Sequence, residues 1–135
     1  MNSFRSALMI ALALLAAAAA RAEVVVVVNP KHPAASMSAE EVASIYLGKS
    51  TAFVPTDLPE SSALRDEFYA KVVRKDAAQV KVIWARLIFT GKTAPPRRVD
   101  NSVAAVKLVA ANEKGIAYVE KSALDATVKA VLAVQ

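Results

Sequence analysis

Serines and arginines are the residues best suited to chemistry in this sequence, because most other reactive side chains are missing. The 135 residues contain no cysteine and one histidine, His32. This composition excludes disulfides, thiolate zinc sites, thiol nucleophiles and a multi-histidine metal centre within one chain. Neighbouring carboxylates such as Asp66 and Glu67 point in different directions on a helix and do not converge. We therefore expect no enzyme activity, no metal ion and no cofactor.

Two short segments have the residue types that bind anions. Ser61 and Ser62 stand at the predicted start of a helix, where free backbone N–H groups attract anions. Arg65 follows Ser62 by three residues on the same helical face and could add a guanidinium group. Arg97 and Arg98 form a second basic pair after two prolines. The alternatives are that the serines only cap the helix and that the arginines are solvated.

Residues 1–22 predict a secretory signal peptide. Arg5 supplies the positive start, residues 7–20 are apolar and uncharged, and Ala20-Arg21-Ala22 has small residues where signal peptidase cleaves. The apolar stretch is shorter than the ~20 residues that a bilayer span needs, although a retained membrane anchor is the alternative. We expect cleavage after Ala22 and a periplasmic protein.

The rest of the chain, residues 23–135, predicts a single α/β domain. An apolar content of 56% excludes disorder, and a dispersed net charge of +5 argues against nucleic-acid binding. Five β-branched residues at 24–28 predict a strand buried on both faces, as in a parallel sheet. Helices and short apolar strands then alternate, which favours a sheet flanked by helices.

Capping residues and glycines predict where these helices begin and end. Ser38 with Glu41, and Asp76 with Gln79, form two predicted capping boxes. We expect helices between Ser38 and Gly48, from Ser61 or Ser62 past Val72, between Asp76 and Gly91, and from Asn101 or Ser102 to Gly115. Strands are expected over 24–28, 52–56, 116–119 and 127–134. Helical spacing predicts that Trp84, Ile88 and Val103 face inward.

Several segments resemble, in the same order, the phosphate-binding-protein-like (PBP-like) family of type 2 periplasmic solute-binding proteins, which serve phosphate ABC transporters. They are Val-Val-Val-Val-Val-Asn-Pro at 24–30, Met-Ser-Ala-Glu-Glu-Val-Ala-Ser-Ile-Tyr-Leu-Gly-Lys at 37–49, Phe-Thr-Gly-Lys at 89–92, Pro-Pro at 95–96 and Gly-Ile-Ala-Tyr-Val at 115–119. Family members usually have two lobes that close over the anion. The resemblance therefore implies a single lobe with a small, mostly parallel or mixed sheet flanked by helices.

The family's phosphate-binding turn is only partly matched. The family has an arginine followed by Asp-Gly-Ser-Gly-Thr, and alignment on Phe68 places Glu-Ser-Ser-Ala-Leu, residues 60–64, over that pentapeptide. Leu58 then stands where the arginine would be, and Asp57 and Glu60 would repel an anion nearby. The anion site that the residues and the resemblance together imply comprises Ser61, Ser62, Ala63, Arg65, Arg97 and Arg98.

Two functions follow from this resemblance. The first is a periplasmic solute-binding protein that recognises phosphate or a related oxyanion for a membrane ABC transporter. The alternative is a ligand-free interaction module, derived from one binding-protein lobe, that docks on a transporter or another envelope protein. Because an isolated lobe leaves one face of the ligand open, we expect weak binding unless a second copy or a partner covers it.

Overall fold

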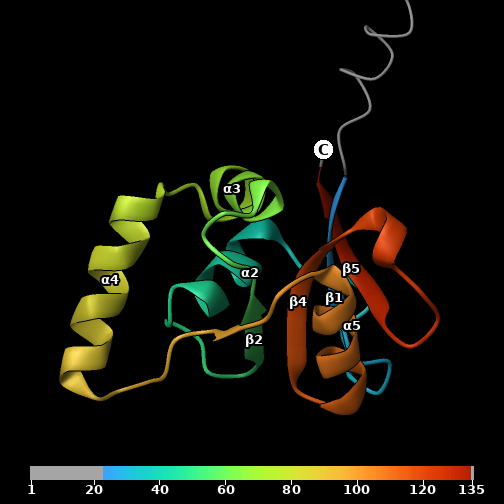
Figure 1. The fold of residues 1–135 in the computed structure, drawn as a ribbon. Helices are drawn as coiled ribbons and strands as arrows, with labels where there is room; N and C mark the ends of the chain where they lie inside the picture. Colours follow the sequence, from blue (N-terminus) through green and yellow to red (C-terminus); the bar gives the residue numbers. More distant parts are fainter. Residues whose placement is uncertain (1–22, 135) are drawn as a thin grey trace, which may run out of the picture.

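A computed structural model describes residues 23–134, in which five strands form one sheet with helices on both faces (Figure 1). The predicted signal peptide, residues 1–22, lies outside the described residues. The elements in chain order are β1 (Val24–Val28), α2 (Ala39–Tyr46), β2 (Val54–Asp57), α3 (Ala63–Phe68), the π-helix η1 (Tyr69–Val73), α4 (Ala77–Thr90), β3 (Arg97–Arg98), α5 (Ser102–Ala111), β4 (Gly115–Glu120), the short 3₁₀ helix η2 (Lys121–Ala123) and β5 (Lys129–Val134).

The sheet is mixed, with the strand order β3-β2-β4-β1-β5. β2 runs parallel to both β3 and β4, whereas β1 runs antiparallel to β4 and to β5. The predicted fold class is therefore confirmed. The five valines of β1 are all buried as predicted, but their neighbouring strands are antiparallel rather than parallel.

Both faces of β1 are covered, because successive side chains of a strand point to opposite sides of the sheet. Val24, Val26 and Val28 belong to the larger core, which includes side chains of α2, η1 and α4. Val25 and Val27 belong to a second core, which includes side chains of α5 and β4. This two-sided burial explains why a run of apolar residues, rather than an alternating pattern, forms this strand.

The helix α4 lies to one side of the sheet (Figure 1). Its predicted capping box is confirmed, since the Asp76 side chain accepts from the Gln79 N–H and the Gln79 side chain accepts from the Asp76 N–H. Trp84 is buried, and its Nε1 donates to the Tyr46 carbonyl at 3.0 Å. Ile88, which was expected to face inward, is 55% exposed because α4 contacts the body along a narrow stripe only.

The strand that precedes α3, β2, differs from its prediction. β2 covers Val54–Asp57 rather than 52–56, and it lies inside the sheet although it contains Pro55. The Val54 N–H donates to the Lys114 carbonyl, so the nitrogen of Pro55 faces the other side, where β3 pairs only from Thr56 onward. Proline is tolerated there because no ladder hydrogen bond is lost.

The last predicted helix also differs from its prediction. α5 ends at Ala111, and Gly115 begins β4 instead of ending the helix. Val103 is 59% exposed rather than buried, because α5 buries the stripe that contains Ala105, Val106 and Val109.

Candidate anion-binding cleft

A buried polar cluster centred on Asp57 lies at the carboxyl end of β2. The Tyr69 hydroxyl donates to Asp57 Oδ2 at 2.7 Å, and the Tyr118 hydroxyl donates to Oδ1. The Leu58 N–H also donates to Oδ1, at 2.9 Å. Asp57 thus accepts three hydrogen bonds from the protein itself, so its burial is compensated.

Aromatic rings surround this cluster and exclude water from it. Phe68 stacks on Tyr118 with a centroid distance of 4.0 Å, and Tyr46 packs edge-on against Phe68 at 4.7 Å. Burial, followed by the charge of Asp57, raises the pKa of both Tyr69 and Tyr118 well above the ordinary tyrosine value. Both hydroxyls therefore remain protonated donors to the carboxylate at physiological pH.

Arg65 is held beside this cluster. Its Nε lies 3.4 Å from Asp57 Oδ1, and its guanidinium carbon lies 4.7 Å from the centre of the Tyr69 ring. The Nε nevertheless makes no hydrogen bond, although the side chain is only 10% exposed. Burial lowers the pKa of Arg65 and is the largest single effect, but the acidic groups around it, Asp57 foremost, together outweigh burial and the net shift is upward. Arg65 is thus a permanent cation that is oriented by Asp57 without being hydrogen-bonded to it.

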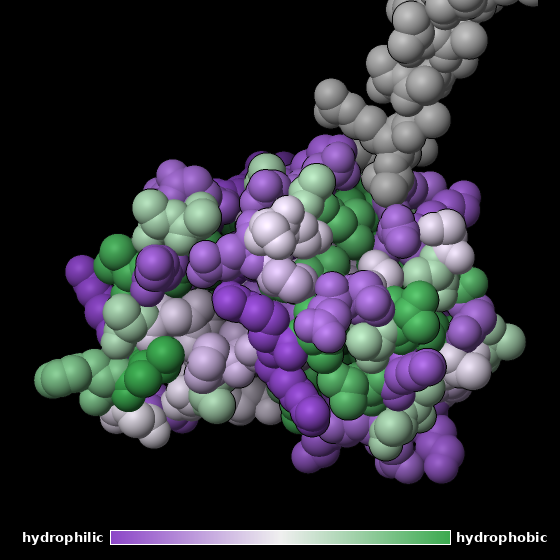
Figure 2. Space-filling model, in the orientation of Figure 1, coloured by the Kyte–Doolittle hydropathy of each residue, from purple (hydrophilic) through white to green (hydrophobic). Residues whose placement is uncertain are grey.

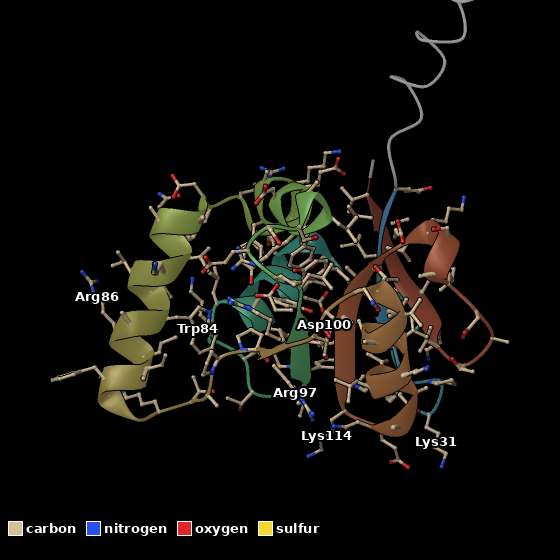
Figure 3. All side chains as sticks on the ribbon, in the orientation of Figure 1. Lys31, Trp84, Arg86, Arg97, Asp100 and Lys114 are labelled. Atoms are coloured by element: carbon tan, nitrogen blue, oxygen red, sulfur yellow. The ribbon has the colours of Figure 1, made fainter. Side chains whose placement is uncertain are left out.

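The Arg65 side chain lines a cleft of about 660 Å³ between α4 and the sheet edge. Figure 2 shows hydrophobic and hydrophilic side chains intermixed over α4 and a band of hydrophilic side chains across the middle of the same face. In Figure 3, Trp84 points from α4 towards the rest of the molecule, whereas Arg86 points away from it. The cleft is lined by Asp57, Glu60, Arg65, Asp66, Tyr69, Ala77, Ala78, Val80, Lys81, Trp84, Ala85, Ile88, Pro95, Pro96 and Arg98.

Only two of the six residues in the sequence-based site line this cleft, namely Arg65 and Arg98. Arg98 lies in the short strand β3 at the sheet edge, and its Nη2 is 3.8 Å from Glu60 Oε1. Arg97, its neighbour in β3, lines a different hollow and is drawn at the lower side of the molecule in Figure 3.

Ser61, Ser62 and Ala63 lie at the start of α3, outside the lining of the cleft. The Ser62 hydroxyl accepts from the Arg65 N–H at 3.3 Å, and the Ser62 N–H donates to the Pro59 carbonyl at 2.9 Å. The helix-capping role of Ser62, one of the two sequence-based alternatives, is therefore present. Two of the amides at this turn are engaged within the chain, so an anion here would depend more on guanidinium groups than on the backbone.

The sequence reasoning missed the cluster that orients Arg65. Asp57 was expected only to repel an anion, and neither Tyr69 nor Tyr118 was singled out. Tyr118 is 61 residues from Asp57 in the chain, so no local pattern signals their contact. An acidic residue directly after a predicted strand was the one available signal.

The charges around the cleft are balanced. Three basic side chains line it, namely Arg65, Lys81 and Arg98, together with the three acidic side chains of Asp57, Glu60 and Asp66.

Among residues 23–134, no group of three or more metal-ligating side chains could hold a metal ion. In the same part of the chain, no helix is long and apolar enough to cross a bilayer.

Comparison with known proteins identifies the fold. No protein-family model matches the chain, and no curated protein matches it. Solved structures do match it. One, from Clostridium perfringens, is assigned as a phosphate ABC transporter substrate-binding protein and was solved with bound phosphate; it is 23% identical with a TM-score of 0.66. An ABC-type phosphate transport receptor from Vibrio cholerae is 20% identical with a TM-score of 0.64, and PstS from Borrelia burgdorferi is 10% identical with a TM-score of 0.62.

Each of these matches covers 82% of this chain but less than half of the other protein, between 45% and 47%. At these identities the likeness establishes the fold rather than the activity. The protein has the five-stranded mixed sheet with flanking helices of a PBP-like lobe.

Proposed function

We propose that this protein is an exported solute-binding protein that recognises phosphate or a related oxyanion for an ABC transporter. The matched fold supports this proposal, because structures with the same architecture are named as phosphate transport receptors and one holds phosphate. The cleft lies at the carboxyl ends of the parallel strands β2 and β3, which is where open α/β sheets commonly bind ligands.

The observation that carries the proposal is the position of Arg65. Two tyrosine hydroxyls and a backbone amide already satisfy Asp57, and the charge of Asp57 holds Arg65 in the cleft wall, with the buried Nε at 3.4 Å from Oδ1. A fixed guanidinium binds an oxyanion at low entropic cost, because little side-chain freedom remains to be lost.

Arg98 is the second expected contact. It pairs with Glu60 at 3.8 Å, and both side chains are more than half exposed. Exposed ion pairs of this kind contribute at most about 1 kcal/mol. An oxyanion bound at Arg65 can therefore displace Glu60 and recruit Arg98. The start of α3, with Ser61, Ser62 and Ala63, borders this position along the chain and remains part of the proposed site. Arg97 lines a different hollow and would add to the site only through its charge.

A calorimetric titration with inorganic phosphate tests the proposal, and β3 offers a matched pair of variants. Arg98→Ala removes a cleft cation, whereas Arg97→Ala removes an equal charge from the adjacent residue outside the cleft. We expect phosphate binding in the micromolar to millimolar range and a loss of about fivefold to tenfold in Arg98→Ala, with a smaller loss in Arg97→Ala. If neither inorganic phosphate nor a phosphate ester binds at up to millimolar concentration, the proposal is rejected.

The alternative function is a ligand-free interaction module that docks on an envelope protein. It is favoured by the outer face of α4, where Val82 is 53% exposed and Phe89 is 92% exposed. Crosslinking in the periplasm separates the two functions. The crosslinks of a solute carrier to a transporter change when phosphate is added, and those of a docking module do not.

A further inference from the structure

We propose that the ligand of the cleft is an organic phosphate with an elongated apolar group, rather than the free phosphate ion. This inference rests on the proposed function, because it assigns the phosphate group of the ligand to Arg65. It adds that the apolar group lies along α4.

The size of the cleft is the first argument. A volume of about 660 Å³ falls within the range of about 300–1,000 Å³ that is usual for pockets that hold organic ligands. The α4 wall extends from Ala77 to Ile88, which at the helical rise corresponds to roughly 16 Å. A single tetrahedral ion beside Arg65 would leave most of this length empty.

The chemistry of the walls is the second argument. α4 contributes Val80, Trp84 and Ile88, and the opposite side contributes Pro95 and Pro96. Ile88 is 55% exposed in the free protein, so a ligand that covers it removes apolar surface from water. Such burial is favourable by about 25 cal/mol per Å². An apolar chain therefore gains from this wall, whereas a bare ion gains nothing.

The charge balance is the third argument. Glu60 and Asp66 line the cleft together with Arg65 and Arg98, so the net field offers little attraction to a small dianion. Recognition of an anion here needs free energy from a source other than charge. The contact of an apolar group with α4 supplies it, while Arg65 fixes the orientation of the ligand.

Calorimetric titration of the mature protein with three probes tests the inference. The probes are inorganic phosphate, hexyl phosphate and 1-hexanol, which separate the charged group from the apolar chain. We expect hexyl phosphate to bind at least tenfold more tightly than either of the other two.

Two substitutions on α4 provide the matched control. Ile88→Asn alters the cleft wall, whereas Val82→Asn alters a residue of the same helix that is similarly exposed, at 53%, but lies outside the cleft lining. We expect Ile88→Asn to weaken hexyl phosphate binding by about fivefold to tenfold and Val82→Asn to bind as the wild type does. Circular dichroism of both variants verifies that α4 remains folded.

The possible failures are distinguishable. If inorganic phosphate binds as tightly as hexyl phosphate, or if both asparagine variants bind hexyl phosphate equally, the inference is overturned and the proposed function stands. If 1-hexanol binds as tightly as hexyl phosphate, or if neither phosphate compound binds, the proposed function fails as well.

Discussion

At the scale of single residues, the main feature is the buried carboxylate of Asp57, whose hydrogen bonds all come from the protein itself. Asp57 accepts hydrogen bonds from Tyr69, Tyr118 and the Leu58 N–H, and it orients Arg65 at 3.4 Å. A carboxylate in this setting stabilises the fold through charge-assisted hydrogen bonds and positions a cation at the same time. Asp57 thus contributes both to the stability of the fold and to the proposed binding of an anion by Arg65.

The buried tyrosines should make the folded protein less stable at alkaline pH. Burial, with a further contribution from the Asp57 charge, raises the pKa of Tyr46, Tyr69 and Tyr118, the three tyrosines of the chain, above the ordinary value of 10.0. The unfolded chain releases these protons near pH 10, whereas the folded protein retains them. The stabilisation is therefore complete below pH 10 and is lost as the pH rises beyond it, by up to about 4 kcal/mol per pH unit for three groups.

Urea unfolding at about pH 9 and about pH 11 measures this loss, and tyrosinate absorbance should appear only together with unfolding. Tyr118→Phe is the control variant, because it removes one of the three groups and should reduce the slope by about one third. Tyrosinate absorbance that rises near pH 10 while Trp84 fluorescence remains native would contradict this account.

At the scale of elements, the attachment of α4 decides the shape of the cleft. Gly48 follows α2 with a φ of +73°, and a Cβ atom there would lie 2.6 Å from Leu87 Cδ1 and 3.1 Å from Trp84. A side chain at residue 48 would therefore force Leu87 and the ring of Trp84 to move. The Trp84 hydrogen bond to the Tyr46 carbonyl fixes the contact of α4 with the end of α2.

Gly48→Ala should loosen α4, and Gly91→Ala is its matched control. Gly91 has a similar φ of +68°, but a Cβ there would meet no atom within 4 Å. We expect a loss of about 1 kcal/mol from backbone strain in both variants and a further 1–3 kcal/mol from overpacking in Gly48→Ala. Urea unfolding measures the difference, and the emission of Trp84, the single tryptophan, should shift to the red in Gly48→Ala only. If both variants lose the same free energy of unfolding, the contact of Gly48 with α4 does not contribute to stability.

The elements could be predicted well from the sequence because their signals are local. Ser38 with Glu41 and Asp76 with Gln79 each lie within one helical turn, and both capping boxes are present. The sequence predicts no strand at Arg97 and Arg98, since a two-residue strand has no pattern of its own. They become a strand only because β2 offers an edge for pairing.

The candidate site was less accessible to sequence reasoning than the fold was. Arg65 was selected for its distance from Ser62, and the structure places it in the cleft for a different reason, its proximity to Asp57. The contacts that fix Arg65 join β2, η1 and β4, and the pairing of these elements is set by the whole sheet. Helical spacing could have indicated the contact of Arg65 with Tyr69, four residues on, but not the contacts of Asp57 with Arg65 and Tyr118.

At the scale of the whole molecule, the first prediction concerns export. Glu23 is the first described residue; its carbonyl accepts from the Lys121 N–H, and its carboxylate lies 3.4 Å from Lys121 Nζ. The folded body thus includes the residue that directly follows the predicted cleavage site. Sequencing of the exported protein from its N-terminus should begin at Glu23, and recovery of residues 1–22 on that protein would contradict the prediction. Protein retained in the cytoplasm serves as the uncleaved control.

The pairing of the edge strand β5 with β1 has a practical consequence. Val24 at the start of β1 lies directly opposite Val134 at the end of β5, and Figure 1 shows this corner far from α4. A tether fused to the C-terminus therefore leaves the molecule at the side remote from the cleft. A protein immobilised by that end would present its ligand-facing surface to the solution, unobstructed by the support.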